Sequence, residues 1–377
     1  MTLPCRALAL SCLLAAGLVA GAAAAPSAEV PARARPKAAK PATKPAAVRA
    51  DDAPEAVTYG RREDVMRFAA ETAERLQLDP DWVAQQLAQA RFQPSVVRFI
   101  MPPPAGTAKN WAAYRARFVE PKRVRAGADF WALHADTLAR AQAQYGVPAE
   151  IVVGVIGVET FYGRMMGGYR VLDALATLAF DFPSGRSDRS AFFRDELAQF
   201  LALCRREALD CRQPRGSYAG AMGWPQFMPS SWNAQAVDYD GNGRVDLIGS
   251  AVDAIGSVAH YLAAHGWQPG LPTHYGVAPP VDSTARATLL APDIVPSFSP
   301  AQFTELGARL APEADRHDGP LALVELQNGE AAPSFVAGTR NFYVVTRYNW
   351  SSYYAMAVIE LGRAVAEVRG LPVAAGR

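Results

Sequence analysis

Residues 151–158 constrain the fold more than any other part of the chain. They read IVVGVIGV, a run without a polar side chain that ends at Glu159. We expect a helix from about Ala149 to Thr160. In such a helix Glu159 lies one turn after Val155 and Ile156, so it projects from an apolar face.

A carboxyl group in these surroundings has a predictable chemistry. Burial disfavours the ionised form and raises the pKa of a glutamic acid, which suits a general acid working near neutral pH. Gly154 and Gly157 weaken the helix by about 1 kcal/mol each relative to alanine, which suggests that another helix or a ligand approaches closely. The alternative is a structural glutamate paired with a base such as Arg164.

The rest of the chain after Tyr59 is patterned mainly for helices. Apolar residues with helical spacing predict helices over residues 65–76, 81–90, 130–145, 190–206, 250–265 and 353–368. Asp79 and Pro80 form a typical helix start. Gly146 and Gly266 are placed to end helices.

Residues 270–345 differ in composition from the helical part. They are richer in Pro, Gly and Thr, and they contain short apolar runs at 321–326 and 342–346. This pattern indicates a small β-containing lobe inserted late in the chain. We therefore predict a mainly α (α+β) fold.

The N-terminal residues predict export. Arg6 is followed by the apolar run 7–20 and by small residues up to Ala25, as in a cleaved signal peptide; an uncleaved anchor and a lipoprotein modified at Cys12 are the alternatives. Residues 26–58 are rich in Ala, Pro and basic residues and should form a disordered linker. The domain organisation is then signal 1–25, linker 26–58 and folded domain 59–377.

Cysteine content and charge add two further expectations. In an oxidising compartment Cys204 and Cys211 could form one short-range disulfide, or they remain two buried thiols. The net charge is +2, with seven basic and four acidic residues in the first 58, so the folded part is close to neutral. A nucleic-acid partner is not expected, because such proteins concentrate basic charge on their fold.

Three separated motifs resemble the lytic murein transglycosylase B family, glycoside hydrolase family 103. They are GVETFYGR at 157–164, GSYAGAMGWPQFMPSSW at 216–232, and TRYN at 346–349 followed by YYAMA at 353–357. The resemblance extends over about residues 60–370. It implies a lysozyme-like helical catalytic core, a periplasmic enzyme that is soluble or associated with the outer membrane, and peptidoglycan glycan strands as substrate. It further implies a monomer, other cell-wall enzymes as partners, and no cofactor for the chemistry.

The family's reaction needs only one carboxyl group. Glu159 would protonate the glycosidic oxygen between N-acetylmuramic acid and N-acetylglucosamine, and the N-acetyl group would stabilise the cation-like sugar. Glu159 would then take the proton of the 6-hydroxyl, giving a 1,6-anhydro end. Asp173, Asp181 or Asp188 as a second carboxylate would instead make a hydrolytic muramidase. A non-catalytic wall-binding protein is the third possibility.

The resemblance also assigns residues to a substrate cleft. These residues are Ser217, Gln226, Tyr348, Asn349 and Tyr354, with Tyr261 and Arg189 as further candidates. Tyrosine offers an apolar ring face to a sugar and a hydroxyl to its polar rim. The family often shows two adjacent arginines where this chain has Arg186-Ser-Asp-Arg189, so the assignment of Arg186 stays open.

Residues 238–253 contain a loop spaced like an EF-hand. Asp238, Asp240 and Asn242 occupy oxygen-donor positions, and the carbonyl of Arg244 would point inward. The bidentate Glu is missing, and Asp253 could substitute for it. We expect a structural Ca²⁺ or Na⁺ ion here; the alternative is an Asx-rich turn without metal.

Overall fold

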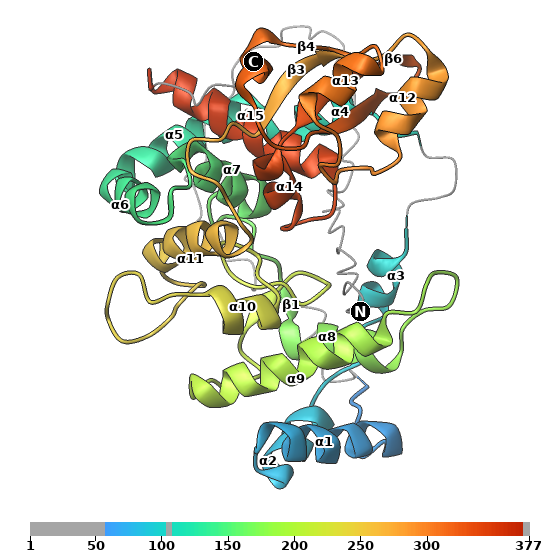
Figure 1. The fold of residues 1–377 in the computed structure, drawn as a ribbon. Coiled ribbons are helices and arrows are strands. Elements are labelled where there is room, and N and C mark those ends of the chain that lie inside the picture. The colour runs from blue at the N-terminus through green and yellow to red at the C-terminus, as the bar shows by residue number, and fades with distance from the viewer. Residues whose placement is uncertain (1–56, 103–107, 372–377) are drawn as a thin grey trace, which may run out of the picture.

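A computed structural model describes residues 57–102 and 108–371 of the chain. Most of it is helical, as the sequence predicts, and the ribbon shows a smaller part that contains β3, β4 and β6 at the top of the molecule (Figure 1). The predicted signal peptide and nearly all of the predicted linker lie outside the described residues. None of the described helices has both the length and the apolar character needed to cross a membrane.

The helices up to residue 264 are α1 (Glu63–Leu76), α2 (Pro80–Ala88), α3 (Pro94–Ile100), α4 (Trp111–Phe118), α5 (Pro121–Leu133), α6 (Ala135–Tyr145), α7 (Ala149–Thr160), α8 (Val171–Phe180), α9 (Ser190–Arg206), α10 (Pro229–Gln235) and α11 (Ala251–Ala264). The helices after residue 264 are α12 (Ser283–Leu290), α13 (Pro300–Glu305), α14 (Arg340–Thr346) and α15 (Ser352–Val368).

The centre of the fold is the contact between α7 and α15. The residues of α7 from Ala149 to Val158 are all buried. A Cβ atom on Gly154 would overlap the carbonyl oxygen of Val358 in α15, so glycine permits this close approach. The close helix approach that the sequence suggested is therefore confirmed. It fixes α15 beside the C-terminal end of α7.

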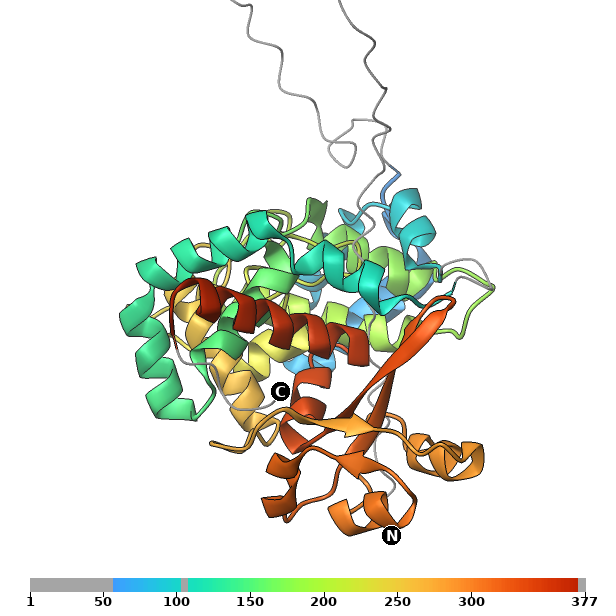
Figure 2. The ribbon, with the colours of Figure 1, turned by 90° about the horizontal axis from the view of Figure 1, so that it is seen from above.

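A four-stranded antiparallel sheet forms the predicted β lobe, with strand order β4-β3-β6-β5. Its strands are β3 (His274–Ala278), β4 (Arg309–Leu310), β5 (Ala322–Asn328) and β6 (Ala331–Gly338). The lobe has a small core of its own, built around Phe303, Leu321 and Leu323. Seen from above, the lobe lies to one side of α15, with the β5–β6 hairpin extending along the molecule (Figure 2).

Two expectations about elements are wrong. The apolar run Phe342–Thr346, which forms part of the pattern that predicts the β-containing lobe, belongs to helix α14, because Thr339 caps the helix by accepting the backbone N–H of Asn341. The helix expected over 130–145 is divided at His134 into α5 and α6. Helical hydrogen bonds, from His134 N to Phe130 O and from Leu138 N to His134 O, continue across this division. The apolar spacing of the sequence therefore did not reveal the division.

The expected helix ends are confirmed. The carboxylate of Asp79 accepts the backbone N–H groups of Asp81 and Trp82 at the start of α2. Gly146 directly follows α6, and Gly266 follows α11 after His265; both glycines have positive φ, 69° and 91°. Cys204 and Cys211 are both buried and are not joined by a disulfide, which is the second of the two alternatives.

Candidate active site

Glu159 is the penultimate residue of α7 and the centre of the site. Its side chain is half-buried, and its Oε1 accepts a hydrogen bond of 2.6 Å from the hydroxyl of Tyr354. Tyr354 lies in the first turn of α15, whose N-terminus is capped by Ser351. The described residues contain no ion pair to Glu159, and the guanidinium of Arg164 lies over the ring of Phe161 instead. The alternative of a structural Glu159–Arg164 pair is therefore wrong.

The chain leaves α7 through a left-handed turn. Phe161, Tyr162 and Gly163 have φ values of 52°, 55° and 76°. A left-handed conformation costs about 1–2 kcal/mol for each non-glycine residue. The hydroxyl of Thr160 holds the turn by accepting Gly163 N–H at 3.1 Å and donating to the carbonyl of Trp224 at 2.9 Å. Strain of this kind next to a cavity is typical of a functional site.

The surroundings of Glu159 tune its acidity. Burial raises the pKa of Glu159 from its ordinary value of 4.5 to about 7, and the hydrogen bond from Tyr354 acts in the opposite direction. The carboxyl is thus protonated in a substantial fraction of molecules near neutral pH. One group can both donate and accept a proton under these conditions.

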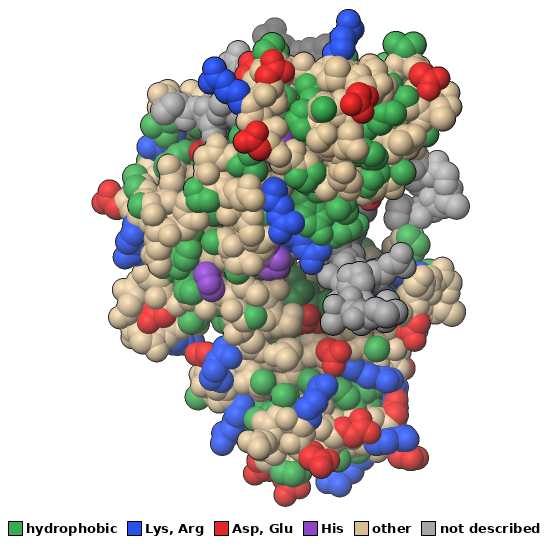
Figure 3. Space-filling view, viewed as in Figure 1, with side chains coloured by type: hydrophobic (Ala, Val, Ile, Leu, Met, Phe, Trp, Pro, Cys, Tyr) green, Lys and Arg blue, Asp and Glu red, His purple; other side chains and the backbone are tan. Residues whose placement is uncertain are grey.

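Glu159 opens into a cavity of about 210 Å³. Its wall is formed by Phe99, Glu159, Met165, Gly167, Gly168, Tyr169, Ser217, Tyr218, Ala221, Gln226, Met228, Tyr348 and Asn349. The space-filling view shows the molecule hollowed between its upper part and the part that carries α8 and α9, with hydrophobic side chains on the upper wall (Figure 3). Aromatic faces and a few polar groups are the usual lining of a sugar site.

The loop between β2 (Arg215–Gly216) and α10 contributes Ser217 and Gln226 to this cavity. The oxygen of Ser217 accepts the N–H groups of Ala219 and Ala221, which leaves its own hydrogen for a ligand acceptor. Gln226 has a positive φ of 49°. Its amide nitrogen donates to the carbonyls of Met166 and Gly223, which leaves its side-chain oxygen as an acceptor.

Tyr348 and Asn349 reach the cavity from the segment between α14 and α15. The ring of Tyr348 is stacked on that of Tyr354, and its hydroxyl donates to Pro225 O. Asn349 carries a buried Oδ1 that has no hydrogen-bond partner among the described residues. An unsatisfied buried acceptor in a cavity wall is suited to a ligand donor.

Three expected cleft residues, Tyr354, Tyr261 and Arg189, do not line the cavity. The hydroxyl of Tyr354 donates to Glu159 behind the cavity wall. The ring of Tyr261 packs under Tyr348 at 4.8 Å, and its hydroxyl donates to Arg347 O, so it supports the cleft from behind. Arg189 precedes α9 and lies over the ring of Phe192. Arg186 donates to Ile100 O beside α3.

The three aspartates considered as second carboxylates have structural partners away from the cavity. Asp173 is fully buried against Arg170. Asp181 accepts bonds from Tyr59 and Arg62. Asp188 accepts the N–H and hydroxyl of Ser190 at the start of α9. Glu159 is therefore the carboxyl group of this cavity among the described residues.

Several cavity residues escaped the sequence analysis. Phe99 and Tyr218 face each other with ring centroids 5.9 Å apart, and Met165 and Tyr169 complete the wall. Tyr218 stands inside the second motif and could have been found there. Phe99 lies on α3, where nothing in the sequence connects it to Glu159.

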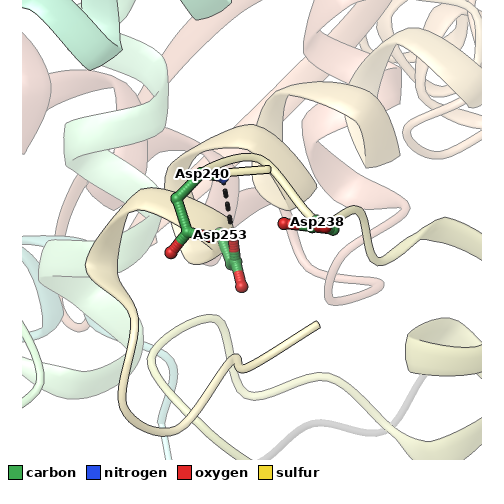
Figure 4. Close-up of side chains that lie close together, drawn as sticks. All are labelled: Asp238, Asp240 and Asp253. Atoms are coloured by element: carbon green, nitrogen blue, oxygen red, sulfur yellow. Dashed lines mark hydrogen bonds between the residues drawn. The ribbon is translucent and has the colours of Figure 1, made fainter. Parts of the chain in front are cut away.

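The EF-hand-like loop joins α10 to α11 and brings three carboxylates together. Asp238, Asp240 and Asp253 each offer an oxygen within 4.8 Å of the others (Figure 4). The carboxylate of Asp238 accepts three backbone N–H groups, and Asn242 Oδ1 accepts that of Arg244. Asp253 accepts the N–H groups of Tyr239, Asp240 and Asp246. The oxygen-rich cluster fits a hard cation, with Asp253 also anchoring the loop backbone.

Comparisons with known proteins agree with this geometry. The family model of the transglycosylase SLT domain matches residues 60–363. Membrane-bound lytic murein transglycosylase B of Escherichia coli K12 is 39% identical over 319 residues, which covers 82% of this chain and 85% of that protein.

Solved structures show the same relationship. The soluble lytic transglycosylase SltB1 of Pseudomonas aeruginosa is 40% identical with a TM-score of 0.73, covering 81% of this chain and 99% of that one. The Escherichia coli lytic transglycosylase Slt35 in complex with calcium is 38% identical with a TM-score of 0.70, covering 82% of this chain and 94% of that one.

Proposed function

This chain belongs to the lytic transglycosylase family, and we propose that Glu159 is its single acid and base in cutting peptidoglycan. The family makes it an enzyme that cleaves glycan strands between N-acetylmuramic acid and N-acetylglucosamine without water. The observation that carries the proposal is a half-buried carboxyl group with a pKa of about 7 in an aromatic cavity.

The reaction would proceed in two steps at one side chain. Protonated Glu159 donates its proton to the glycosidic oxygen, and the bond from that oxygen to the anomeric carbon breaks. The N-acetyl carbonyl oxygen stabilises the cation-like sugar. Glu159, now a carboxylate held by Tyr354, removes the proton of the 6-hydroxyl, whose oxygen bonds to the anomeric carbon. The carboxyl recovers its proton, and no water is consumed.

The cavity residues are suited to orient the N-acetyl group of the substrate, which stabilises the cation-like sugar. Ser217 has a hydrogen to donate, and the N-acetyl carbonyl is an acceptor that needs to be oriented toward the anomeric carbon. Asn349 and Gln226 offer oxygens to sugar hydroxyls or the amide N–H. The rings of Phe99 and Tyr218 suit sugar faces. All these groups come from one chain, so a monomer suffices for the reaction.

Digestion of purified sacculi tests the proposal. We expect the wild-type protein to release muropeptides with 1,6-anhydro ends, which mass spectrometry distinguishes from reducing ends that are one water heavier. Products with reducing ends would indicate a hydrolytic muramidase instead. Wall binding without any soluble product would indicate a non-catalytic protein.

We also propose that the chain works in the cell envelope after export. Residues 1–25 carry the features of a signal peptide, and residues 26–58 would then tether the folded domain. This fits a substrate that lies outside the cytoplasmic membrane. Attachment to the outer membrane and partnership with other wall enzymes are compatible with the tether.

The loop at residues 238–253 is proposed as a structural Ca²⁺ site. Asp238 and Asp240 would supply carboxylate oxygens, with Asn242, the Arg244 carbonyl and Asp253 as the remaining donors. A bound ion would hold the loop against the start of α11. It lies outside the cavity wall, so it has no part in the proton transfers.

Calcium should raise the thermal stability of the protein. A ligand at about 100 times its Kd stabilises a fold by about 2.7 kcal/mol, which corresponds to an increase in Tm of several degrees. We expect this increase on adding CaCl₂ to the EDTA-treated protein, and its loss in Asp238→Asn. Asp282→Asn, the same change at a helix cap in the β lobe, should respond like wild type. An unchanged Tm in the wild type would contradict the site.

A further inference from the structure

Trp224 is hydrogen-bonded to the EF-hand-like loop at residues 238–253, which we call the ion loop. Trp224 stands between α10 and β2, the strand that pairs with β1 (Tyr169–Arg170). Its backbone N–H donates to the carbonyl of Leu247 at 2.9 Å, and its indole Nε1 donates to the carbonyl of Ile248 at 3.1 Å. Two consecutive carbonyls of the ion loop therefore fix both the backbone and the ring of Trp224.

On its other side Trp224 contacts the left-handed turn that follows Glu159. The carbonyl of Trp224 accepts the hydroxyl of Thr160 at 2.9 Å, and the same hydroxyl accepts the N–H of Gly163 at 3.1 Å. A Cβ atom on Gly163 would lie 2.7 Å from a carbon of the Trp224 ring, so the ring packs directly on the turn. A backbone in this conformation persists only where its surroundings hold it, and Trp224 supplies two of the contacts that do so.

The residue before Trp224 connects the ion loop to Gln226 in the cavity wall. A Cβ atom on Gly223 would lie 2.3 Å from the carbonyl oxygen of Leu247, so the two loops are in backbone contact. The carbonyl of Gly223 accepts the backbone N–H of Gln226 at 3.2 Å and its side-chain amide at 2.9 Å. A shift of Leu247 would therefore displace Gln226 as well.

Within the ion loop, hydrogen bonds lead from the carboxylate cluster to Ile248. Asp253, a member of that cluster, accepts the N–H of Asp246 at 2.8 Å. The carboxylate of Asp246 in turn accepts the N–H groups of Ile248 and Gly249 at 3.0 and 2.8 Å. Like charges repel at the short separations of the cluster, and a bound cation would remove this repulsion. The cation would therefore order the segment to which Trp224 donates.

We propose that Trp224 is a positioning residue that couples the ion loop to the cleft, so that a cation in the loop tightens the binding of a glycan. This inference rests on the proposed function, because it takes the cleft to be a glycan site, and on the proposed ion site. The cation touches no reacting atom. It fixes the turn after Glu159 and the side chain of Gln226 before the glycan arrives, which lowers the cost of ordering them on binding.

Reciprocal binding measurements test the coupling. The probe is the disaccharide tripeptide with a 1,6-anhydro end, the product of the proposed reaction, which the enzyme does not consume. In calorimetry we expect saturating CaCl₂ to lower the Kd of the probe about tenfold relative to the EDTA-treated protein, and linkage requires the probe to lower the Kd of Ca²⁺ by the same factor. An ion that only stabilises the fold would leave both constants unchanged.

Trp224→Phe tests the side-chain link. Phenylalanine keeps a ring beside Gly163 and the backbone hydrogen bonds, and it removes the N–H that the carbonyl of Ile248 accepts. The loss of one hydrogen bond should lower the coupling from about tenfold to about twofold. Trp267→Phe is the matched control, because its indole N–H donates to the carbonyl of Gly146 at 3.0 Å, outside the cavity wall. This control should keep the full coupling.

A second pair of variants tests the link at the turn. Thr160→Val removes the hydroxyl that joins Trp224 to Gly163, and we expect it to lower the coupling to about twofold as well. Thr160→Ser keeps a hydroxyl in this position and should retain the tenfold effect. Rescue by serine separates the loss of this hydrogen bond from a general loosening of the fold.

Three results would overturn the inference. The first is a wild type in which Ca²⁺ and the probe bind independently, and the second is full coupling in both Trp224→Phe and Thr160→Val. The third is an equal decrease in Trp224→Phe and Trp267→Phe, which would show an unspecific structural effect. A wild type that shows the coupling but does not cut sacculi would refute the proposed function and leave the coupling intact. One that cuts sacculi without binding Ca²⁺ would overturn the coupling and leave Glu159 as the acid.

Discussion

Replacing Glu159 with glutamine is expected to lower the rate of muropeptide release by about a thousandfold or more. The amide has nearly the same shape as the acid, but it can neither give a proton to the glycosidic oxygen nor take one from the 6-hydroxyl. General acid–base catalysis contributes about 10²–10⁴-fold in rate, and here one residue performs both transfers. Product analysis of digested sacculi measures the effect, and a rate within tenfold of wild type would contradict the assignment.

The same variant should be more stable than wild type at alkaline pH. The pKa of Glu159 is about 7 in the folded protein, above its ordinary value of 4.5. The folded state therefore binds this proton more tightly than the unfolded state, and the associated stability is present below pH 4.5 and lost as the pH rises through 7. At pH 8 to 9 the loss is about 3 kcal/mol.

Thermal melting at two pH values therefore separates a chemical effect from unfolding. Glutamine does not ionise, so Glu159→Gln should melt several degrees above wild type at pH 8.5 and at the same temperature at pH 4. A variant that is inactive and also less stable at pH 8.5 would indicate that the glutamate is structural. A more stable but inactive variant is the usual signature of a group kept for function.

The central part of this site could be predicted because its signals are local. Eight apolar residues followed by a glutamate define a buried helix and a carboxyl group on it. Gly154 indicated a close helix approach, which α15 provides. The motif spacing assigned Ser217, Gln226, Tyr348 and Asn349 to a cleft, and all four line one cavity with Glu159.

Other features depend on contacts that a single sequence does not reveal. Phe99 is 60 residues from Glu159 along the chain. It reaches the cavity because α3 lies near the loop that carries Tyr218. Tyr261 is a tyrosine, as sugar-binding side chains often are, but its hydroxyl donates a hydrogen bond to the carbonyl of Arg347.

The apolar run at 342–346 shows how a short signal is overridden. Val and Phe residues favour a strand, yet Thr339 and Asn341 together determine a helix. Asn341 donates to the carbonyls of Gln268 and Leu271, which fixes the first turn to the preceding segment. Local capping and tertiary hydrogen bonds therefore decide the structure of a run too short for its propensity to do so.

Tyr354 should control both the rate and the pH dependence of the enzyme. Its hydroxyl donates to Glu159 Oε1 at 2.6 Å and so stabilises the carboxylate that acts as the base. In wild type, activity should be level below pH 7 and fall about tenfold per unit above it, because the first step needs the protonated acid. Without the hydroxyl, burial alone acts on the carboxyl group, so its pKa rises further.

Tyr354→Phe should therefore lower kcat about tenfold and move the alkaline limb of the profile to higher pH. The loss of rate corresponds to one hydrogen bond to a charged group, and the shift has the sign expected for a carboxylate that has lost its donor. Tyr353→Phe is the matched control, since the neighbouring hydroxyl donates to Gln327 O and not to Glu159. Rates measured from pH 5 to 9 with both variants test this. A purely structural role for Tyr354 would lower kcat and leave the alkaline limb in place, and a shift to lower pH would mean that another group, not Glu159, is the acid.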